Sequence, residues 1–171
     1  MQKEYHPFEP IIDQNSEILI LGTFPSLDSF KYQFYYAHKR NQFWKISSDI
    51  FKVTLNSDKE KIDFLLSTHI ALWDIVKSCE RKNSADSNLK NVVAYDIRAL
   101  LNSYPNIKKI LFTGKKAEAI YKRYFKDLNI QTIVLPSPSP AYAAMSYEKK
   151  LIYYKKELAF NLTMVNTKFF D

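Results

Sequence analysis

Runs of large aliphatic residues alternate with amphipathic segments along the whole of this chain. The aliphatic runs show little polar alternation, which is typical of parallel strands buried on both faces, and they lie at 18–22, 70–73, 109–113 and 132–135. The intervening segments repeat apolar residues at helical spacing, at 42–52, 57–66, 96–101, 115–126 and 146–160. Strands separated by helices predict a three-layer α/β/α sandwich around a parallel sheet of roughly four strands.

Three connecting segments follow the ends of predicted strands. Residues 23–41 form a loop dense in Phe and Tyr, residues 77–91 are the most polar stretch, and residues 136–140 read Pro-Ser-Pro-Ser-Pro. Residues 1–16 are expected to form an extended arm that leads into the first strand. Ligands of open α/β sheets bind beyond the carboxyl ends of the strands, so the three loops should meet at one edge and form a site there.

Length and composition favour one globular domain over residues 1–171, because 46% of the residues are hydrophobic. Aromatic residues make up 15%, and the net charge is +7. A basic, aromatic chain suits a polyanionic partner with bases, such as DNA. The alternative, a lysine-rich surface that serves only solubility, is also open at this point.

Several classes of protein are disfavoured by residue usage. The single cysteine, Cys79, argues against disulfides and fits a reducing cytoplasm. His6 and His69 stand far apart, and no spacing of Cys, His and Asp is typical of a metal site, so no metal or cofactor is expected. No apolar run approaches the roughly 20 residues of a membrane span, and the first residues lack the pattern of a signal peptide. The expectation is therefore a cytoplasmic monomer with no membrane contact.

Three motifs carry a family resemblance: 22–26 (GTFPS), 36–44 (YAHKRNQFW) and 135–141 (LPSPSPA). Together they resemble the uracil-DNA glycosylase superfamily. The most similar branch is that of the hypoxanthine-DNA (deoxyinosine) glycosylases, followed by the mismatch-specific uracil/thymine glycosylases. The order and spacing of elements match over nearly the whole chain.

The resemblance implies a monofunctional N-glycosylase of base-excision repair. Such an enzyme flips a deaminated base, most of all hypoxanthine, out of duplex DNA and hydrolyses its N-glycosidic bond, leaving an abasic site. Two alternatives stay open. The chain could be a glycosylase for uracil or thymine mismatches, or a catalytically inactive module that retained the DNA-binding groove.

Three positions depart from the superfamily pattern. Phe24 stands where most members carry a catalytic Asp or Asn, and Leu135 stands where the uracil-specific branch carries a His. Thr113 precedes a glycine where an Asn would be expected. In the hypoxanthine branch the Asn before Gln-Phe-Trp takes over the essential role, which here is Asn41. A carboxamide can hold the attacking water in place, and the same residue can be the N-cap of the helix that follows.

Other residues are expected to contact the flipped nucleotide. Backbone N–H groups of the 22–26 turn could stabilise the leaving base, and Tyr36 could stack on it, unless Tyr36 is simply a core residue. His38 could act as a general acid, although a bracing hydrogen bond is the more ordinary role. The set of substrate-binding residues is Gly22, Thr23, Phe24, Pro25, Ser26, Tyr36 and His38.

A third group is expected to contact the DNA outside the pocket. The Ser137 and Ser139 hydroxyls could bind phosphates, and Tyr142 or Met145 could fill the gap left by the flipped base. Arg81, with Lys77 and Lys82, could line the rim of the groove. The predicted DNA-binding residues are Ser137, Ser139, Pro140, Ala141, Tyr142 and Arg81. Asp74 and Asp86 are interpreted as a strand-end acceptor and a loop organiser rather than as a catalytic pair.

Overall fold

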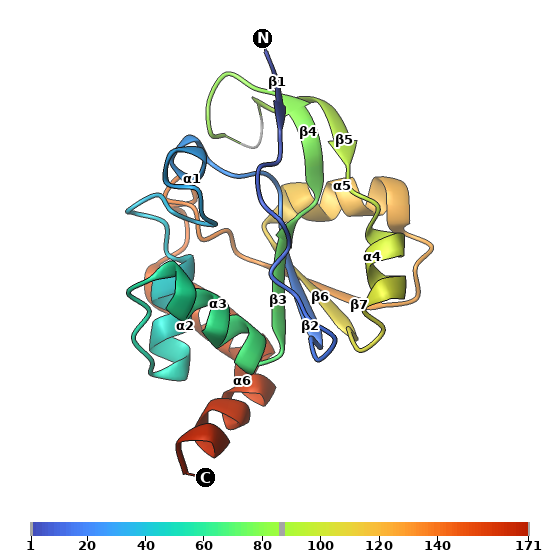
Figure 1. Cartoon of the computed structure of the whole chain (residues 1–171). Helices are drawn as coiled ribbons and strands as arrows, with labels where there is room; N and C mark the ends of the chain where they lie inside the picture. Colours follow the sequence, from blue (N-terminus) through green and yellow to red (C-terminus); the bar gives the residue numbers. More distant parts are fainter. Residues whose placement is uncertain (1, 86–87, 171) are drawn as a thin grey trace.

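A parallel sheet of order β3-β2-β6-β7 forms the centre of the protein, whose computed structural model describes residues 2–85 and 88–170 (Figure 1). All three pairings between neighbouring strands are parallel. The strands are β2 (Ile18–Gly22), β3 (Ile70–Asp74), β6 (Lys109–Thr113) and β7 (Gln131–Leu135). The predicted four-stranded parallel sheet is therefore confirmed, almost residue for residue.

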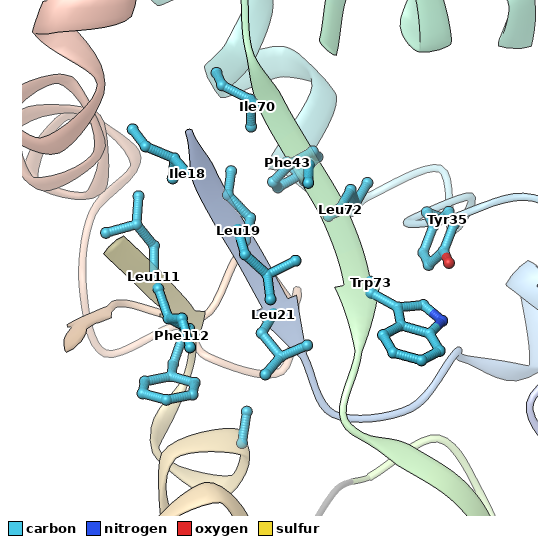
Figure 2. Packing of buried hydrophobic residues seen from close by; sticks show 14 of the residues in the cluster. Ile18, Leu19, Leu21, Tyr35, Phe43, Ile70, Leu72, Trp73, Leu111 and Phe112 are labelled. Carbon is cyan, nitrogen blue, oxygen red and sulfur yellow. The ribbon is translucent and has the colours of Figure 1, made fainter. Parts of the chain in front are cut away.

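The core is centred on β2, which has neighbours on both sides. Leu19 lies opposite Ala71 of β3 and Ile110 of β6, and all three residues are fully buried. Figure 2 shows aliphatic side chains of β2, β3 and β6 packed together near the ring of Phe43. A strand buried on both faces must be apolar at every position, which explains the unbroken aliphatic runs in the sequence.

Helices cover both faces of the sheet (Figure 1), which completes the predicted three layers. On one side lie α2 (Phe43–Phe51), α3 (Asp58–Ser67) and α6 (Tyr147–Phe170); on the other lie α4 (Ile97–Ser103) and α5 (Lys115–Phe125). Helix α6 continues beyond the predicted end at residue 160. Within the described residues, no helix is both long enough and apolar enough to cross a bilayer.

A second, antiparallel sheet was not predicted. It has the order β1-β4-β5 and consists of β1 (Lys3–Tyr5), β4 (Val76–Glu80) and β5 (Lys90–Ala94). Within the predicted extended arm over 1–16, residues 3–5 form a paired strand, and the predicted loop over 77–91 is wrong where β4 and β5 form. The buried positions of β4 include Ser78 and Cys79, which are small and weakly hydrophobic, so the strand reads as polar. The chain runs from β3 into β4 with only Ile75 between them (Figure 1).

The aromatic loop after β2 also contains regular structure that was not predicted. A short helix, α1 (Leu27–Tyr32), begins after Ser26, whose side chain accepts a hydrogen bond from the Ser29 amide. The Ser29 hydroxyl in turn accepts from the amide of Ala37, so the helix braces the rest of the loop. Asp86, the expected loop organiser, lies outside the described residues.

Candidate active site

The three loops meet in a pocket of about 610 Å³ beyond the carboxyl ends of the parallel strands. The predicted catalytic, substrate-binding and DNA-binding sets all line this pocket, except for Gly22 and Arg81; Met145, Lys77 and Lys82, which were also considered as DNA contacts, do not line it. The predicted residues in its wall are Thr23, Phe24, Pro25, Ser26, Tyr36, His38, Asn41, Ser137, Ser139, Pro140, Ala141 and Tyr142. The pocket also contains residues that were not predicted as ligand contacts, among them Tyr35, Asp74, Asn83, Ser84 and Thr113. The expected convergence of the three motifs is therefore what the structure shows.

Asn41 stands in the pocket wall just before helix α2. Its Oδ1 accepts a hydrogen bond from the Phe43 amide at 2.9 Å, which closes a side-chain turn onto the first residue of the helix. The helix begins one residue later than predicted, so Gln42 is its N-cap and the prediction that Asn41 is the N-cap is wrong. The bond to Phe43 fixes the orientation of the carboxamide. It uses one of the two lone pairs of Oδ1, so the second lone pair and the NH₂ group can act on a ligand or water.

Tyr36 is held in a strained backbone conformation. Its φ angle is 53°, in the left-handed region that bulky residues avoid, and such strain concentrates at functional sites. One face of its ring stacks on Phe43 at 4.3 Å between centroids, and its hydroxyl shares a 2.9 Å hydrogen bond with Thr113 Oγ1. Thr113 thus anchors the tyrosine, and stacking of a base on Tyr36 stays a prediction.

His38 braces the aromatic loop. Its Nδ1 accepts a hydrogen bond from the Arg40 amide at 3.1 Å, and its backbone carbonyl accepts from the Asn41 amide at 2.9 Å. With Nδ1 as acceptor, a neutral ring carries its proton on Nε2, which lies 3.7 Å from an Asp28 carboxylate oxygen. The bracing role of His38 is therefore confirmed, and its backbone carbonyl holds the Asn41 amide.

Gly22 lies beneath the pocket rather than in its wall. A β-carbon at this position would lie 2.5 Å from Asp74 Oδ1, 2.8 Å from the Tyr36 hydroxyl and 3.2 Å from Thr113 Oγ1. Three polar groups therefore converge over the glycine. Only a residue without a side chain allows this approach, as expected for a strand end where backbone comes close to another group.

Arg81 does not lie at the rim of the groove, where it was expected. Its side chain is 2% exposed, and its Nε donates to Glu4 Oε2 at 2.7 Å. The guanidinium also donates to the Pro25 carbonyl and lies 4.9 Å from the ring centroid of Phe24. Burial and ion pairing make Arg81 a support for the 22–26 turn, with its guanidinium directed inward.

Asp74 and His6 form a buried pair that sequence reasoning did not connect. His6 Nε2 donates to Asp74 Oδ2 at 2.8 Å, and their side chains are 0% and 6% exposed. The pKa of the Tyr35 hydroxyl is raised above its usual range, mainly by burial and secondly by the negative charge of Asp74. No group of three or more metal-ligating side chains occurs in the described part of the chain. The pairing could not be found in the sequence because 68 residues separate its partners.

The Pro-Ser turn holds its own shape through its hydroxyls. Ser137 Oγ accepts from the Ser139 amide and Ser139 Oγ accepts from the Ala141 amide, each at 3.2 Å. A hydroxyl that accepts in this way keeps its hydrogen as a donor for an external oxygen. Tyr142, at the end of the turn, is 39% exposed and lines the pocket, whereas Met145 does not line it.

Lys150 of helix α6 connects the Pro-Ser turn to the beginning of helix α2. It is 2% exposed, and its ammonium donates to Gln42 Oε1 at 2.9 Å and to the Tyr142 carbonyl at 2.8 Å. The backbone amide of Gln42 in turn donates to the Pro138 carbonyl at 2.9 Å. Burial lowers the pKa of Lys150. This lysine was not predicted, since it looks like an ordinary surface residue of a basic helix.

Comparison with known proteins gives consistent matches. The family model described as "Uracil DNA glycosylase superfamily" matches residues 9–163. Hypoxanthine DNA glycosylases from Methanosarcina barkeri (strain Fusaro) and Methanosarcina acetivorans are each 34% identical over 136 residues, covering 78% of this chain and 85% of the relative. A solution NMR structure of a Methanosarcina acetivorans protein, assigned as a uracil DNA glycosylase, has a TM-score of 0.78 at 29% identity, covering 95% of this chain and 99% of that one.

Proposed function

Because the chain belongs to the uracil-DNA glycosylase superfamily, we propose that it is a monofunctional DNA glycosylase that removes hypoxanthine from deoxyinosine in duplex DNA. It flips the deaminated nucleotide into the pocket and hydrolyses the N-glycosidic bond, leaving an abasic site for base-excision repair. It works as a cytoplasmic monomer on DNA, and the chemistry needs no metal or cofactor.

One observation carries the proposal. The pocket places Asn41, Tyr36 and the 22–26 turn around one cavity, while the two positions expected to carry polar catalytic groups in uracil-cutting relatives hold Phe24 and Leu135. Both of these side chains are buried and apolar. This supports a catalytic role for Asn41, whose carboxamide is a polar group in the pocket wall.

The reaction builds positive charge on the sugar and negative charge on the departing base. Water captures the sugar cation if it is held beside C1′, and Asn41 holds it through the lone pair that the Phe43 amide does not use. Backbone N–H groups of the 22–26 turn stabilise the leaving base as preorganised donors. Pro25 has no N–H, so these donors belong to its neighbours.

The DNA is held by the Pro-Ser turn and the residues that follow it. The Ser137 and Ser139 hydroxyls donate to phosphates that flank the flipped nucleotide. Tyr142 enters the gap in the base stack, since it is half-exposed at the mouth of the pocket. The net charge of +7 favours association with the polyanion.

Hypoxanthine fits this arrangement better than uracil does. A uracil anion would lack the polar partner expected at the Leu135 position, whereas a purine offers N7 and O6 to backbone donors and hydroxyls. A larger ring system also gains more from stacking, which is worth roughly 1–3 kcal/mol per base. Inosine pairs imperfectly in most contexts, which lowers the free energy needed to flip it.

The decisive experiment measures single-turnover excision on matched duplexes with inosine, uracil, xanthine or a thymine mismatch, with alkali to reveal abasic sites. Inosine should react fastest. Faster release of uracil would reassign the chain to the mismatch-uracil branch. DNA binding with no abasic sites on any duplex would make it an inactive binding module.

Asn41→Ala should abolish excision and leave DNA affinity nearly intact, because the lost interaction serves the transition state. Asn41→Ser separates catalysis from the side-chain turn, since a serine hydroxyl can also accept from the amide two residues on but has no carboxamide. Its melting temperature should stay close to wild type while excision is lost. Asn106→Ala, which removes an exposed asparagine elsewhere, is the matched control and should keep full activity. Most of the rate remaining in both Asn41 variants would show that the catalytic assignment is wrong.

A further inference from the structure

The amino-terminal arm contributes a side chain to the back of the pocket. Strand β1 pairs with β4, and the His6 amide continues this pairing by donating to the Lys77 carbonyl at 2.9 Å. The His6 ring is thereby carried behind the floor of the pocket, where its Nε2 contacts Asp74 Oδ2. None of the three motifs that mark the family includes this residue.

The surroundings of His6 fix its ring tightly. Four aromatic rings lie within 6.0 Å of it between centroids: Phe8, Phe24, Tyr35 and Tyr95. Its Nδ1 lies 3.0 Å from the Phe8 carbonyl oxygen and 3.3 Å from the Phe8 amide nitrogen. A cationic ring can donate to the carbonyl and a neutral one can accept from the amide, so Nε2 keeps its hydrogen for Asp74 in both forms.

Asp74 lines the pocket, although its side chain is only 6% exposed. A buried carboxylate is unfavourable unless it is paired, and His6 supplies that partner at Oδ2. The other oxygen, Oδ1, lies over Gly22 together with the Tyr36 hydroxyl. His6 therefore occupies Oδ2, whereas Oδ1 lies over Gly22 near the hydroxyl of Tyr36, a residue of the pocket wall.

An acceptor in this position distinguishes deaminated bases from their parents. Deamination of adenine converts N1 from an acceptor into an N–H donor, and cytosine changes in the same way at N3. A carboxylate oxygen accepts from such an N–H and repels the lone pair of an undamaged ring nitrogen. Guanine presents two adjacent N–H donors that suit both oxygens of a free carboxylate, but Oδ2 of Asp74 is already occupied.

We propose that His6 is a positioning residue that holds Asp74 so that Oδ1 alone accepts an N–H of the flipped base. The inference rests on the proposed function, and it adds the residue pair that separates hypoxanthine from adenine and guanine. Asp74 touches the base, whereas His6 acts through Asp74.

Two His6 variants test this on an inosine duplex. His6→Phe keeps an aromatic ring in the cluster but has no donor, and it should lower the single-turnover rate by about 10- to 100-fold, as for loss of a hydrogen bond to a charged group. His6→Gln places a side-chain amide donor near Asp74 and should restore most of the rate. Tyr5→Ala, which changes the exposed neighbour on the same strand, should match wild type.

Binding separates this proposal from the proposed function. In an Asn41→Ala background, affinity for an inosine duplex should exceed that for the same duplex with adenine, and adding His6→Phe should remove the difference. That comparison holds even if no base is excised. A His6→Phe rate within about threefold of wild type, or equal losses in the Phe and Gln variants, overturns the positioning role. If the preference for inosine over adenine persists in His6→Phe, then Asp74 held by His6 does not distinguish the two bases.

Discussion

Gly22→Ala is the smallest change that should disturb the whole floor of the pocket. The added methyl group would meet Asp74 Oδ1 at 2.5 Å and the Tyr36 hydroxyl at 2.8 Å. Neither the Asp74 carboxylate nor the Tyr36 hydroxyl can move away freely. Asp74 is held by His6 at 2.8 Å, and Tyr36 is held by Thr113 at 2.9 Å and by its stacking on a neighbouring ring.

The magnitude follows from these contacts. Inserting a methyl group into a well-packed site destabilises a protein by about 1–3 kcal/mol, and loss of the hydrogen bond between Tyr36 and Thr113 adds about 0.5–1.5 kcal/mol. The free energy of unfolding should therefore fall by about 2–4 kcal/mol, and the melting temperature of a domain of this size by about 5–15 °C. Excision of inosine should fall by at least about tenfold at a temperature where the variant is folded, because displacement of the floor misplaces the base.

Calorimetry and single-turnover excision on an inosine duplex measure the two effects separately. Leu65→Ala in α3 is the matched control, because it removes a buried side chain outside the pocket and should lower stability by about 2–5 kcal/mol. The control should keep its rate when folded. If Gly22→Ala melts and reacts like wild type, the convergence of polar groups over Gly22 does not constrain the site.

Three other outcomes are expected. Affinity for undamaged duplex should fall steeply as salt is raised, with a slope near −0.9 per phosphate contact in a logarithmic plot; a flat plot would show that the net charge of +7 is not used on DNA. Burial raises the pKa of Tyr35 and of Tyr154, so the native state keeps phenol protons that the unfolded chain releases near pH 10. The free energy of unfolding, measured with urea, should therefore fall above that pH by about 1.4 kcal/mol per pH unit for each phenol. A constant free energy of unfolding would contradict this. Lys150→Met should leave Gln42 Oε1 and the Tyr142 carbonyl without their donor and lower the rate of inosine excision. Lys150→Arg should recover the rate. An unchanged rate in the Met variant would show that the bridge from Lys150 to these two oxygens is dispensable.

The sheet was predictable because β2, β3 and β6 are buried on both faces, a condition that runs of polar residues do not satisfy. The second sheet lacks that signature. Strand β1 has only three residues, and two of the three buried positions of β4 hold Ser78 and Cys79, whose small side chains give no hydrophobic period. Their burial depends on the arm folding over them, which is a tertiary effect that a local pattern does not contain.

The pocket was predictable for a different reason. Its motifs follow strand ends, and the carboxyl edge of a parallel sheet brings such segments together whatever their distance in sequence. No comparable rule predicts the contacts made by the amino-terminal arm. Arg81 looked like a surface cation because Glu4, which buries it in an ion pair, is 77 residues away. The same holds for His6, which does not line the pocket and reaches the site only through its contact with Asp74.

The apolar residue at position 24 follows from that contact. The superfamily pattern favours Asp or Asn there, yet the Phe24 ring lies 6.0 Å from the His6 ring, which already serves Asp74. A carboxylate at position 24 would compete with Asp74 for the same donor and place a second negative charge in a buried pocket, which is strongly unfavourable. A site that holds a carboxylate against the base is better served by an uncharged group for the water, which is the chemistry that Asn41 offers from the pocket wall.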